Sequence, residues 1–311
     1  MTSRFFAFGC SFTQYYWPTW ADIIAHNGNY TDYINWGAPG GGNTFIQSSL
    51  SECSIKHNIN ADDLVIIHWS GACREDRWVN GSWVNYGSVT NGYSKEFIDN
   101  FTDPVGWFLR DCVNIHNAVT LLNAIGCEYY MLSMEPMYFT DGTVGDITKV
   151  YKLYLDQVRK SVCEVVFNNN WDSRRQELYS DVMPPEPLLQ LKWFKASYDN
   201  KKGTSWPDFE DLLTTNLPSH LHDEIIISIN EDTQTAITNL SELKNTMYSY
   251  KLVVNGHPTP LMWLEYVYKV LPEIVIIDQT VEWVIDKNAN LFANDPGSRQ
   301  LPCIEPITDR F

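Results

Sequence analysis

Short apolar runs alternate with segments of helical spacing along the first half of this chain. The runs have the length and the aromatic or β-branched content of buried strands, whereas the segments between them repeat apolar residues every three to four positions. The predicted strands are Arg4–Phe8, Tyr30–Trp36, Asp63–His68 and Glu128–Met134. The predicted helices are Pro18–Asn27, Thr44–Asn58, Val105–Ile125, Ile147–Val166 and Pro260–Leu271. This alternation predicts an α/β fold with a mainly parallel sheet covered by helices.

Three segments depart from this rhythm. Residues 79–104 are rich in Asn, Gly, Ser and aromatics, and the turn signals Asn80-Gly81 and Asn91-Gly92 indicate a hairpin or long loop. This segment follows the third strand, so it is either a wall over a site or a surface excursion without function.

Residues 168–222 are polar and proline-containing, which indicates an insertion or small subdomain. Strand-like runs follow at 224–229 and 250–254, with a short apolar run at 273–277. Residues 280–311 show no clear period and are expected to wrap the surface of a single domain spanning 1–311.

The first strand leads directly into a serine. Gly9 and Ser11 form a Gly-x-Ser turn between the strand and the first helix. Glycine permits a sharp turn there, and the carboxyl end of a parallel strand is where open α/β sheets build their sites. Serine also caps helices in proteins with no chemistry at that position. The turn therefore needs support from elsewhere in the chain before it indicates a site.

Three later stretches provide that support. They read NWGAPGGGN from Asn35 to Asn43, HWSGACR from His68 to Arg74, and NGHP from Asn255 to Pro258. In this order, the four stretches resemble the conserved blocks of the SGNH hydrolases, also called GDSL-like esterases. The resemblance covers residues 1–140 and 245–275. It implies a flavodoxin-like three-layer α/β/α sandwich with a five-stranded sheet and insertions. It also implies hydrolysis of a small ester, such as an O-acetyl group on a carbohydrate, without a cofactor.

The resemblance also implies a role for each block. Ser11 takes the place of the nucleophile and His257 that of the base, while the N–H groups of Ser11 and Gly40 stand as oxyanion donors. Ser70 occupies the position of the asparagine that donates a third hydrogen bond in the family. Acyl transfer to serine needs these three functions: a nucleophile, a base and donors for the developing oxyanion. A phosphate-binding reading of Gly40-Gly41-Gly42 lacks the lysine of a P-loop.

The chain departs from the family at three positions: Cys10 and Asn255 stand where the family has aspartates, and Ser70 where it has asparagine. Asn255 can orient His257 but stabilises an imidazolium poorly. A backbone carbonyl or Glu135, at the end of the fourth strand, is an alternative partner for the histidine. These departures leave a second function open, in which an SGNH-like fold with a weakened or inactive site serves for carbohydrate binding or as a structural protein, for instance in a virus particle.

Candidate substrate contacts are Arg74, Trp69 and Asn43. Arg74 can bind a substrate carboxylate or brace its own loop. Aromatic residues form 14% of the chain, with 12 Trp and 17 Tyr, and they either face a carbohydrate or pack an interior or an interface of a homo-oligomer or larger assembly.

Charge and local composition exclude several partners. The net charge of −16 argues against nucleic acid and anionic membranes. No run of about 18 apolar residues and no signal peptide is visible, so we expect synthesis in a cytoplasm. Seven scattered cysteines indicate reduced thiols. His220-Leu221-His222-Asp223 lacks a further ligand at a telling spacing, so no metal site is predicted.

Overall fold

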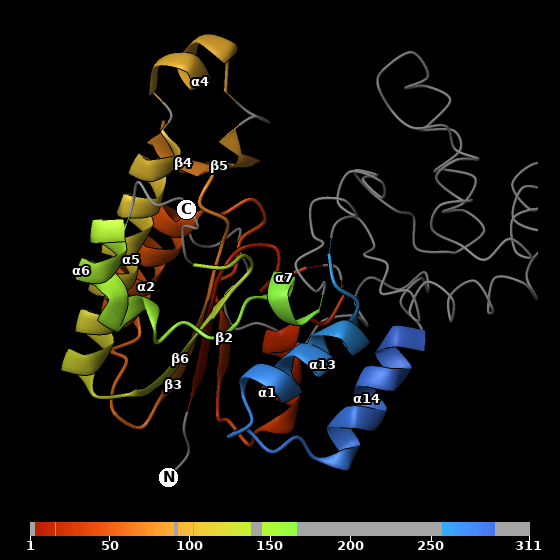
Figure 1. Ribbon diagram of the computed structural model, residues 1–311. Helices are drawn as coiled ribbons and strands as arrows, with labels where there is room; N and C mark the ends of the chain where they lie inside the picture. The colour runs from red at the N-terminus through yellow and green to blue at the C-terminus, as the bar shows by residue number, and fades with distance from the viewer. Residues whose placement is uncertain are drawn as a thin grey trace, which may run out of the picture.

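The computed structural model describes residues 4–15, 17–89, 93–101, 103–137, 145–166 and 257–289. Within these ranges the centre of the protein is a sheet of four parallel strands in the order β2-β1-β3-β6 (Figure 1). The strands are β1 Phe5–Phe8, β2 Tyr33–Asn35, β3 Leu64–Trp69 and β6 Glu128–Ser133. Each falls inside or within one residue of its predicted range, because its apolar run is long enough to be buried on the sheet.

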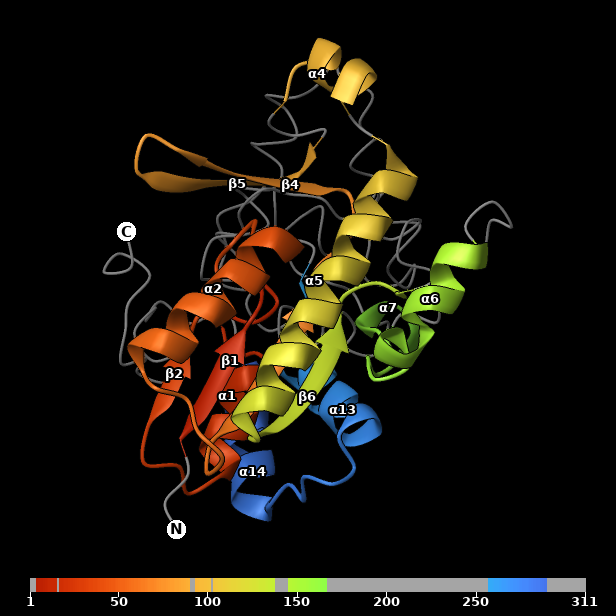
Figure 2. The same cartoon turned by 90° about the vertical axis from the view of Figure 1, so that its left-hand side faces the viewer.

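The strand order decides which face each connecting helix covers. The chain steps from β1 to β2 in one direction, then crosses back over β1 to β3 and on to β6. Because parallel crossovers are right-handed, this reversal moves the connecting helices to the opposite face. Accordingly α1 (Trp20–Asn27) covers one face, and α2 (Asn43–Lys56) and α5 (Pro104–Ile125) pack together on the other (Figure 2). The helices α13 (Pro260–Val270) and α14 (Asp278–Ala289) lie beside α1.

Two hydrophobic cores result, one on each face of the sheet. The side chains of β1 alternate between them: Phe5 and Ala7 pack with α1 and α13, whereas Phe6 and Phe8 pack with α2 and α5. All four are fully buried, as expected of a central strand that is apolar at every position. The protein is therefore an α/β protein with helices on both faces of a parallel sheet, an arrangement compatible with a three-layer sandwich.

A two-stranded antiparallel hairpin lies across the carboxyl end of the sheet (Figure 2). It consists of β4 (Arg74–Val79) and β5 (Ser82–Ser88), and the short helix α4 (Lys95–Phe101) follows it. Asn80 and Gly81 both have positive φ, 52° and 85°, which is the backbone of a two-residue hairpin turn. The turn signal was thus interpreted correctly, but the hairpin begins at Arg74, five residues before the expected segment.

The expectation of one helix over Ile147–Val166 is wrong. The chain forms α6 (Gly145–Leu155), leaves the helix, and then forms the one-turn α7 (Val162–Val165). Between them Val158 makes an isolated parallel bridge to Met131, and the Arg159 N–H donates to the Met131 carbonyl at 2.8 Å. Backbone pairing with the outer edge of β6 interrupts the helix at this point.

Residues 280–289, which lie in the segment expected to wrap the surface, form most of α14, which extends through Ala289. This helix is held by tertiary contacts: Val284 is fully buried, and Trp283 stacks on His26 with ring centroids 4.4 Å apart. The other expectations for 168–222, 224–229, 250–254 and the turn at Asn91-Gly92 lie outside the described residues, as does the chain from residue 290. The apolar run at 273–277 forms no strand.

Candidate active site

Ser11 lies on the turn that joins β1 to α1. The N–H groups of Thr13 and Gln14 both donate to the Cys10 carbonyl, at 2.9 and 3.2 Å, and so close the turn. Gly9 makes this possible, since a Cβ at that position would collide with Oγ1 of Thr13. The helix itself begins later than Pro18 suggested.

Cys10 and Ser11 point in different directions from this turn. Cys10 is fully buried in the core beneath α1 and α13, whereas Ser11 keeps 8% of its surface exposed. The Cys10 sulfur accepts the N–H of Phe12 at 3.5 Å. The thiol is therefore part of the core, and the hydroxyl is the group presented at the end of the strand.

Ser11 meets His257 across 246 positions of sequence. The Ser11 Oγ lies 2.7 Å from Nε2 of His257. When Nε2 is unprotonated it accepts the serine O–H, which is the geometry of a nucleophile paired with a general base. His257 stands just before α13, whose N-cap is Thr259 and whose first residue is Pro260. The rigid start of this helix fixes the backbone that carries the imidazole.

A buried polar network supports the serine turn from below. Thr19 is the N-cap of α1, and its Oγ1 donates to the Thr13 carbonyl at 2.9 Å, while Nδ2 of Asn35 donates to the same oxygen at 2.9 Å. The carboxylate of Asp22 accepts from the Thr19 N–H at 2.8 Å and from the Tyr33 hydroxyl at 3.2 Å. Burial raises the pKa of Asp22 to about 6, although these hydrogen bonds act in the opposite direction.

The glycine-rich loop after β2 is tied to the serine turn. Oδ1 of Asn35 accepts the N–H of Gly37 at 2.8 Å, and the Ala38 N–H donates to the Gly9 carbonyl at 3.0 Å. Asn35 therefore fixes both the start of the loop and the turn beside it. The serine turn follows β1 and the glycine-rich loop follows β2. Because these neighbouring strands are parallel and in register, the two segments meet at the carboxyl end of the sheet.

Gly40 lies in the left-handed region and against the hairpin. Its φ is 77°, and a Cβ would collide with the carbonyl oxygen of Asn85. The Gly87 N–H donates to the Gly40 carbonyl at 3.1 Å. Within the described residues, no acceptor takes the N–H of Gly40 or that of Ser11. Both groups are thus left for a further acceptor.

Ser70 follows β3 at the same level as Ser11 follows β1, because Phe8 pairs with Ile67 in the parallel register. Its side chain is fully buried, and its hydroxyl has no hydrogen-bond partner within the described residues. The segment is anchored by Asn43, the first residue of α2, which bonds the Ser70 backbone with both atoms of its amide.

Asp111 on α5 completes this arrangement. Its Oδ2 accepts from Nδ2 of Asn43 at 2.7 Å, and it is 1% exposed. Burial raises the pKa of Asp111 to about 7, although the neighbouring guanidinium of Arg110 and the hydrogen bond from Asn43 lower it. Asp111, which is partly protonated near neutral pH, is thus connected to the Ser70 backbone through the side chain of Asn43.

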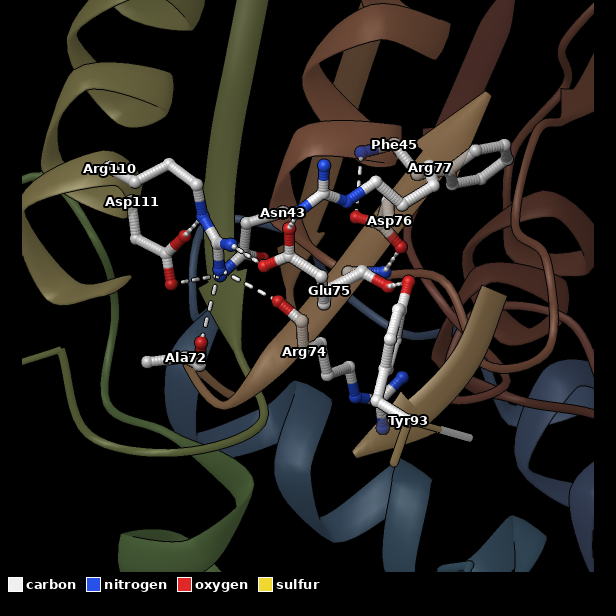
Figure 3. A network of polar contacts seen from close by, with 11 residues as sticks. Asn43, Phe45, Ala72, Arg74, Glu75, Asp76, Arg77, Tyr93, Arg110 and Asp111 are labelled. Carbon is white, nitrogen blue, oxygen red and sulfur yellow. Dashed lines mark hydrogen bonds and ion pairs between the residues drawn. The ribbon is translucent and has the colours of Figure 1, made fainter. Parts of the chain in front are cut away.

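The hairpin holds the glycine loop and the start of α2 through two charged residues. Asp76 on β4 accepts the N–H groups of Gly42 and Phe45 at 2.8 and 3.0 Å, so a carboxylate caps the positive end of α2 (Figure 3). The guanidinium of Arg74 donates to the Gly41 carbonyl at 2.9 Å. Burial raises the pKa of Asp76 against these hydrogen bonds.

Arg110 joins the hairpin to α5. It donates to the carbonyl oxygens of Ala72 and Arg74 at 3.1 and 2.8 Å and pairs with Glu75 at 3.0 Å (Figure 3). The segment between Ser70 and β4 is therefore held by backbone-directed hydrogen bonds from a neighbouring helix.

The three expected substrate contacts are all buried in this fold. Trp69 is the last residue of β3 and is fully buried in the core with α2 and α5. Asn43 is 1% exposed and both its amide atoms are engaged. Arg74, 8% exposed, braces the loop, which is one of the two roles that the sequence allows for it. These contacts give each residue a place within the protein, and the expectation that the three residues bind substrate stays a prediction.

Glu135 lies past the end of β6 but faces Gly71. A Cβ on Gly71 would approach both carboxylate oxygens of Glu135, at 2.8 and 3.1 Å. Asn255, the other expected partner of the histidine, lies outside the described residues.

Sequence reasoning missed Asp111, Asp76 and Tyr15 as residues around this site. Asp111 carried a usable signal, since a carboxylate interrupts the apolar stripe of α5 between Phe108 and Ile115. Asp76 and Tyr15 had none, because only folding brings the hairpin to α2 and Tyr15 to His257.

No group of three or more His, Cys, Asp or Glu side chains within the described ranges is placed to hold a metal ion, and His220-x-His222 lies outside them. Among the described helices, none combines the length and hydrophobicity needed to cross a membrane. The sequence matches no protein-family model, and no curated protein is significantly similar to it.

Proposed function

We propose that this protein is an SGNH-like serine esterase that uses Ser11 as nucleophile and His257 as general base. The observation that carries the proposal is the 2.7 Å contact between Ser11 Oγ and His257 Nε2. It lies at the carboxyl ends of β1 and β3, where the strand order reverses direction and where open parallel sheets bind their ligands.

In the proposed reaction, the Ser11 oxygen attacks the carbonyl carbon of a small ester while its proton moves to Nε2 of His257. The tetrahedral oxyanion accepts hydrogen bonds from the N–H groups of Ser11 and Gly40, which have no acceptor among the described residues. Ser70, whose buried hydroxyl also has no partner there, is the third proposed donor. His257 then returns the proton to the leaving alkoxide, and water repeats the sequence on the acyl-enzyme to release the acid.

We also propose that the sheet has a fifth strand, as in the SGNH fold. Its fifth strand would lie outside β6, where Val158 already bridges Met131. An O-acetyl group on a carbohydrate is the proposed substrate, since a short acyl group suits a serine that is only 8% exposed.

A fluorophosphonate probe and p-nitrophenyl acetate test the reaction. We expect wild type to be labelled and to turn over the ester, and both activities to vanish in Ser11→Ala and His257→Ala. Ser48→Ala is the matched control, because among the described residues the hydroxyl of this α2 serine bonds a carbonyl of its own helix, at 2.8 Å. Wild type indistinguishable from Ser11→Ala would reject the esterase and favour a binding or structural role.

Asn255→Asp tests whether the native triad lacks its acid. A rise in turnover of about tenfold or more, equivalent to about 1.4 kcal/mol of barrier, is expected if residue 255 faces the histidine as the family pattern implies. An unchanged rate would show that the acid's function is supplied elsewhere.

A further inference from the structure

The imidazole of His257 lies flat against the ring of Tyr15. The two ring centroids are 3.8 Å apart and the planes differ by 14°. A second ring, Phe12, meets the imidazole at a steep angle of 64° with centroids 5.1 Å apart. The histidine that contacts Ser11 is therefore bounded by two aromatic side chains, both from the segment that follows the nucleophile.

Tyr15 is itself fixed in place. Trp17 packs edge-on against it, with centroids 4.4 Å apart and planes at 80°. Nε1 of Trp17 donates to the carbonyl oxygen of Pro258 at 2.8 Å, which ties this aromatic segment to the backbone next to His257. Tyr15 and Trp17 are 8% and 6% exposed. The stacked pair is thus built from packed, largely buried side chains.

A histidine base needs its ring held in one orientation and its charge stabilised once it has taken the proton. A carboxylate does both in a serine triad. The face of a tyrosine ring carries negative potential and attracts a cation placed over it, more strongly where water is excluded. A flat stack also restricts rotation of the imidazole ring about the Cβ–Cγ bond.

We propose that Tyr15 is a positioning residue that holds the His257 ring toward Ser11 and stabilises its protonated form. This inference rests on the proposed esterase function. The described groups that face the imidazole include the Ser11 hydroxyl and the rings of Tyr15 and Phe12.

The test compares Tyr15→Leu, which removes the aromatic face, with Tyr15→Phe, which keeps it. The rate of fluorophosphonate labelling is measured as a function of pH. At the pH where this rate no longer rises, we expect Tyr15→Leu to be labelled about tenfold more slowly than wild type, or slower still. The pH at which the labelling rate is half of its maximum is expected to fall by about half a unit in this variant. That shift corresponds to about a threefold change in the ratio of imidazolium to imidazole. Tyr15→Phe should restore most of the rate and the midpoint. A loss of rate in Tyr15→Leu with an unmoved midpoint would mean packing alone and would overturn the proposal.

An NMR titration of the His257 ring in a Ser11→Ala background separates this inference from the proposed function. The signal is identified by its disappearance in His257→Gln. A lower midpoint after adding Tyr15→Leu supports the stacking role even if wild type proves not to be an esterase. An unchanged midpoint rejects it even if wild type is active.

Discussion

Asn43 holds the backbone of Ser70 at two points: its Oδ1 accepts the Ser70 N–H at 2.7 Å, and its Nδ2 donates to the Ser70 carbonyl at 3.0 Å. The same Nδ2 donates to Asp111. One amide at the start of α2 thus sets where the chain leaves β3, and with it the position of the third proposed oxyanion donor.

Asn43→Ala should therefore reduce both stability and acylation. The substitution leaves two buried backbone groups and one carboxylate without their partner, so we expect the free energy of unfolding to fall by about 3 kcal/mol or more. Chemical denaturation measures this. Asn100→Ala is the control, since within the described part of the chain that exposed asparagine bonds a carbonyl of its own helix, α4, and its loss should cost less than about 0.5 kcal/mol. Equal effects of the two substitutions would contradict the assigned role.

Gly40→Ala should disrupt the contact between the glycine loop and the hairpin. A methyl group there is strained by the φ of 77° and collides with Asn85, whereas Gly81 has a φ of 85° with nothing within 4 Å of its added Cβ. Gly81→Ala therefore reports the backbone cost alone, about 1 kcal/mol. Thermal unfolding should show a clearly larger loss for Gly40→Ala, and probe labelling should fall only in that variant. Matching losses would mean that the close approach is unimportant.

Cys10→Ala should leave probe labelling at Ser11 in place. The thiol lies in the core and faces away from the hydroxyl, so its removal leaves a small cavity and costs stability of about 1 kcal/mol. Mass spectrometry of the labelled peptide locates the modified residue. Loss of labelling in a folded Cys10→Ala protein, together with persistence in Ser11→Ala, would identify the cysteine as the nucleophile.

Asp111→Asn should change the pH dependence of stability. Burial raises the pKa of Asp111 to about 7 in the folded protein, so the folded state binds a proton that the unfolded chain releases near its ordinary, lower pKa. The free energy of unfolding contributed by this group is then fully present at low pH and is lost as the pH rises toward 7. The amide cannot ionise, yet its oxygen can still accept from Asn43.

We therefore expect Asp111→Asn to gain stability relative to wild type between pH 5 and pH 8, by about 1 to 3 kcal/mol. Denaturation of both proteins at each pH isolates Asp111 from other titrating groups such as Asp22, which are common to the two. A difference that grows toward acid pH would have the wrong sign and would refute the assignment.

The sequence by itself determined the parts of this fold that depend on neighbouring residues. The runs at β1 and β3 are apolar and buried at every position, the second half of β6 is buried, and the alternation of these runs with helical periods predicts a parallel sheet. Gly9 before Ser11 indicated a turn, where a Cβ would collide with Thr13, and the Asn80-Gly81 pair indicated a second turn, because few other residues tolerate its positive φ angles. The order of the blocks also indicated that the serine and histidine segments should meet.

Only the tertiary structure decided what each polar group near the site does. Arg74 braces the Gly41 carbonyl and Asn43 holds the Ser70 backbone, and both contacts join segments that are far apart in the sequence. Likewise, α14 lacked a clear period and depends on partners such as His26. Periodicity records which residues are buried, whereas a buried polar group or ring takes its role from segments far away in sequence, which come together only when the sheet is assembled.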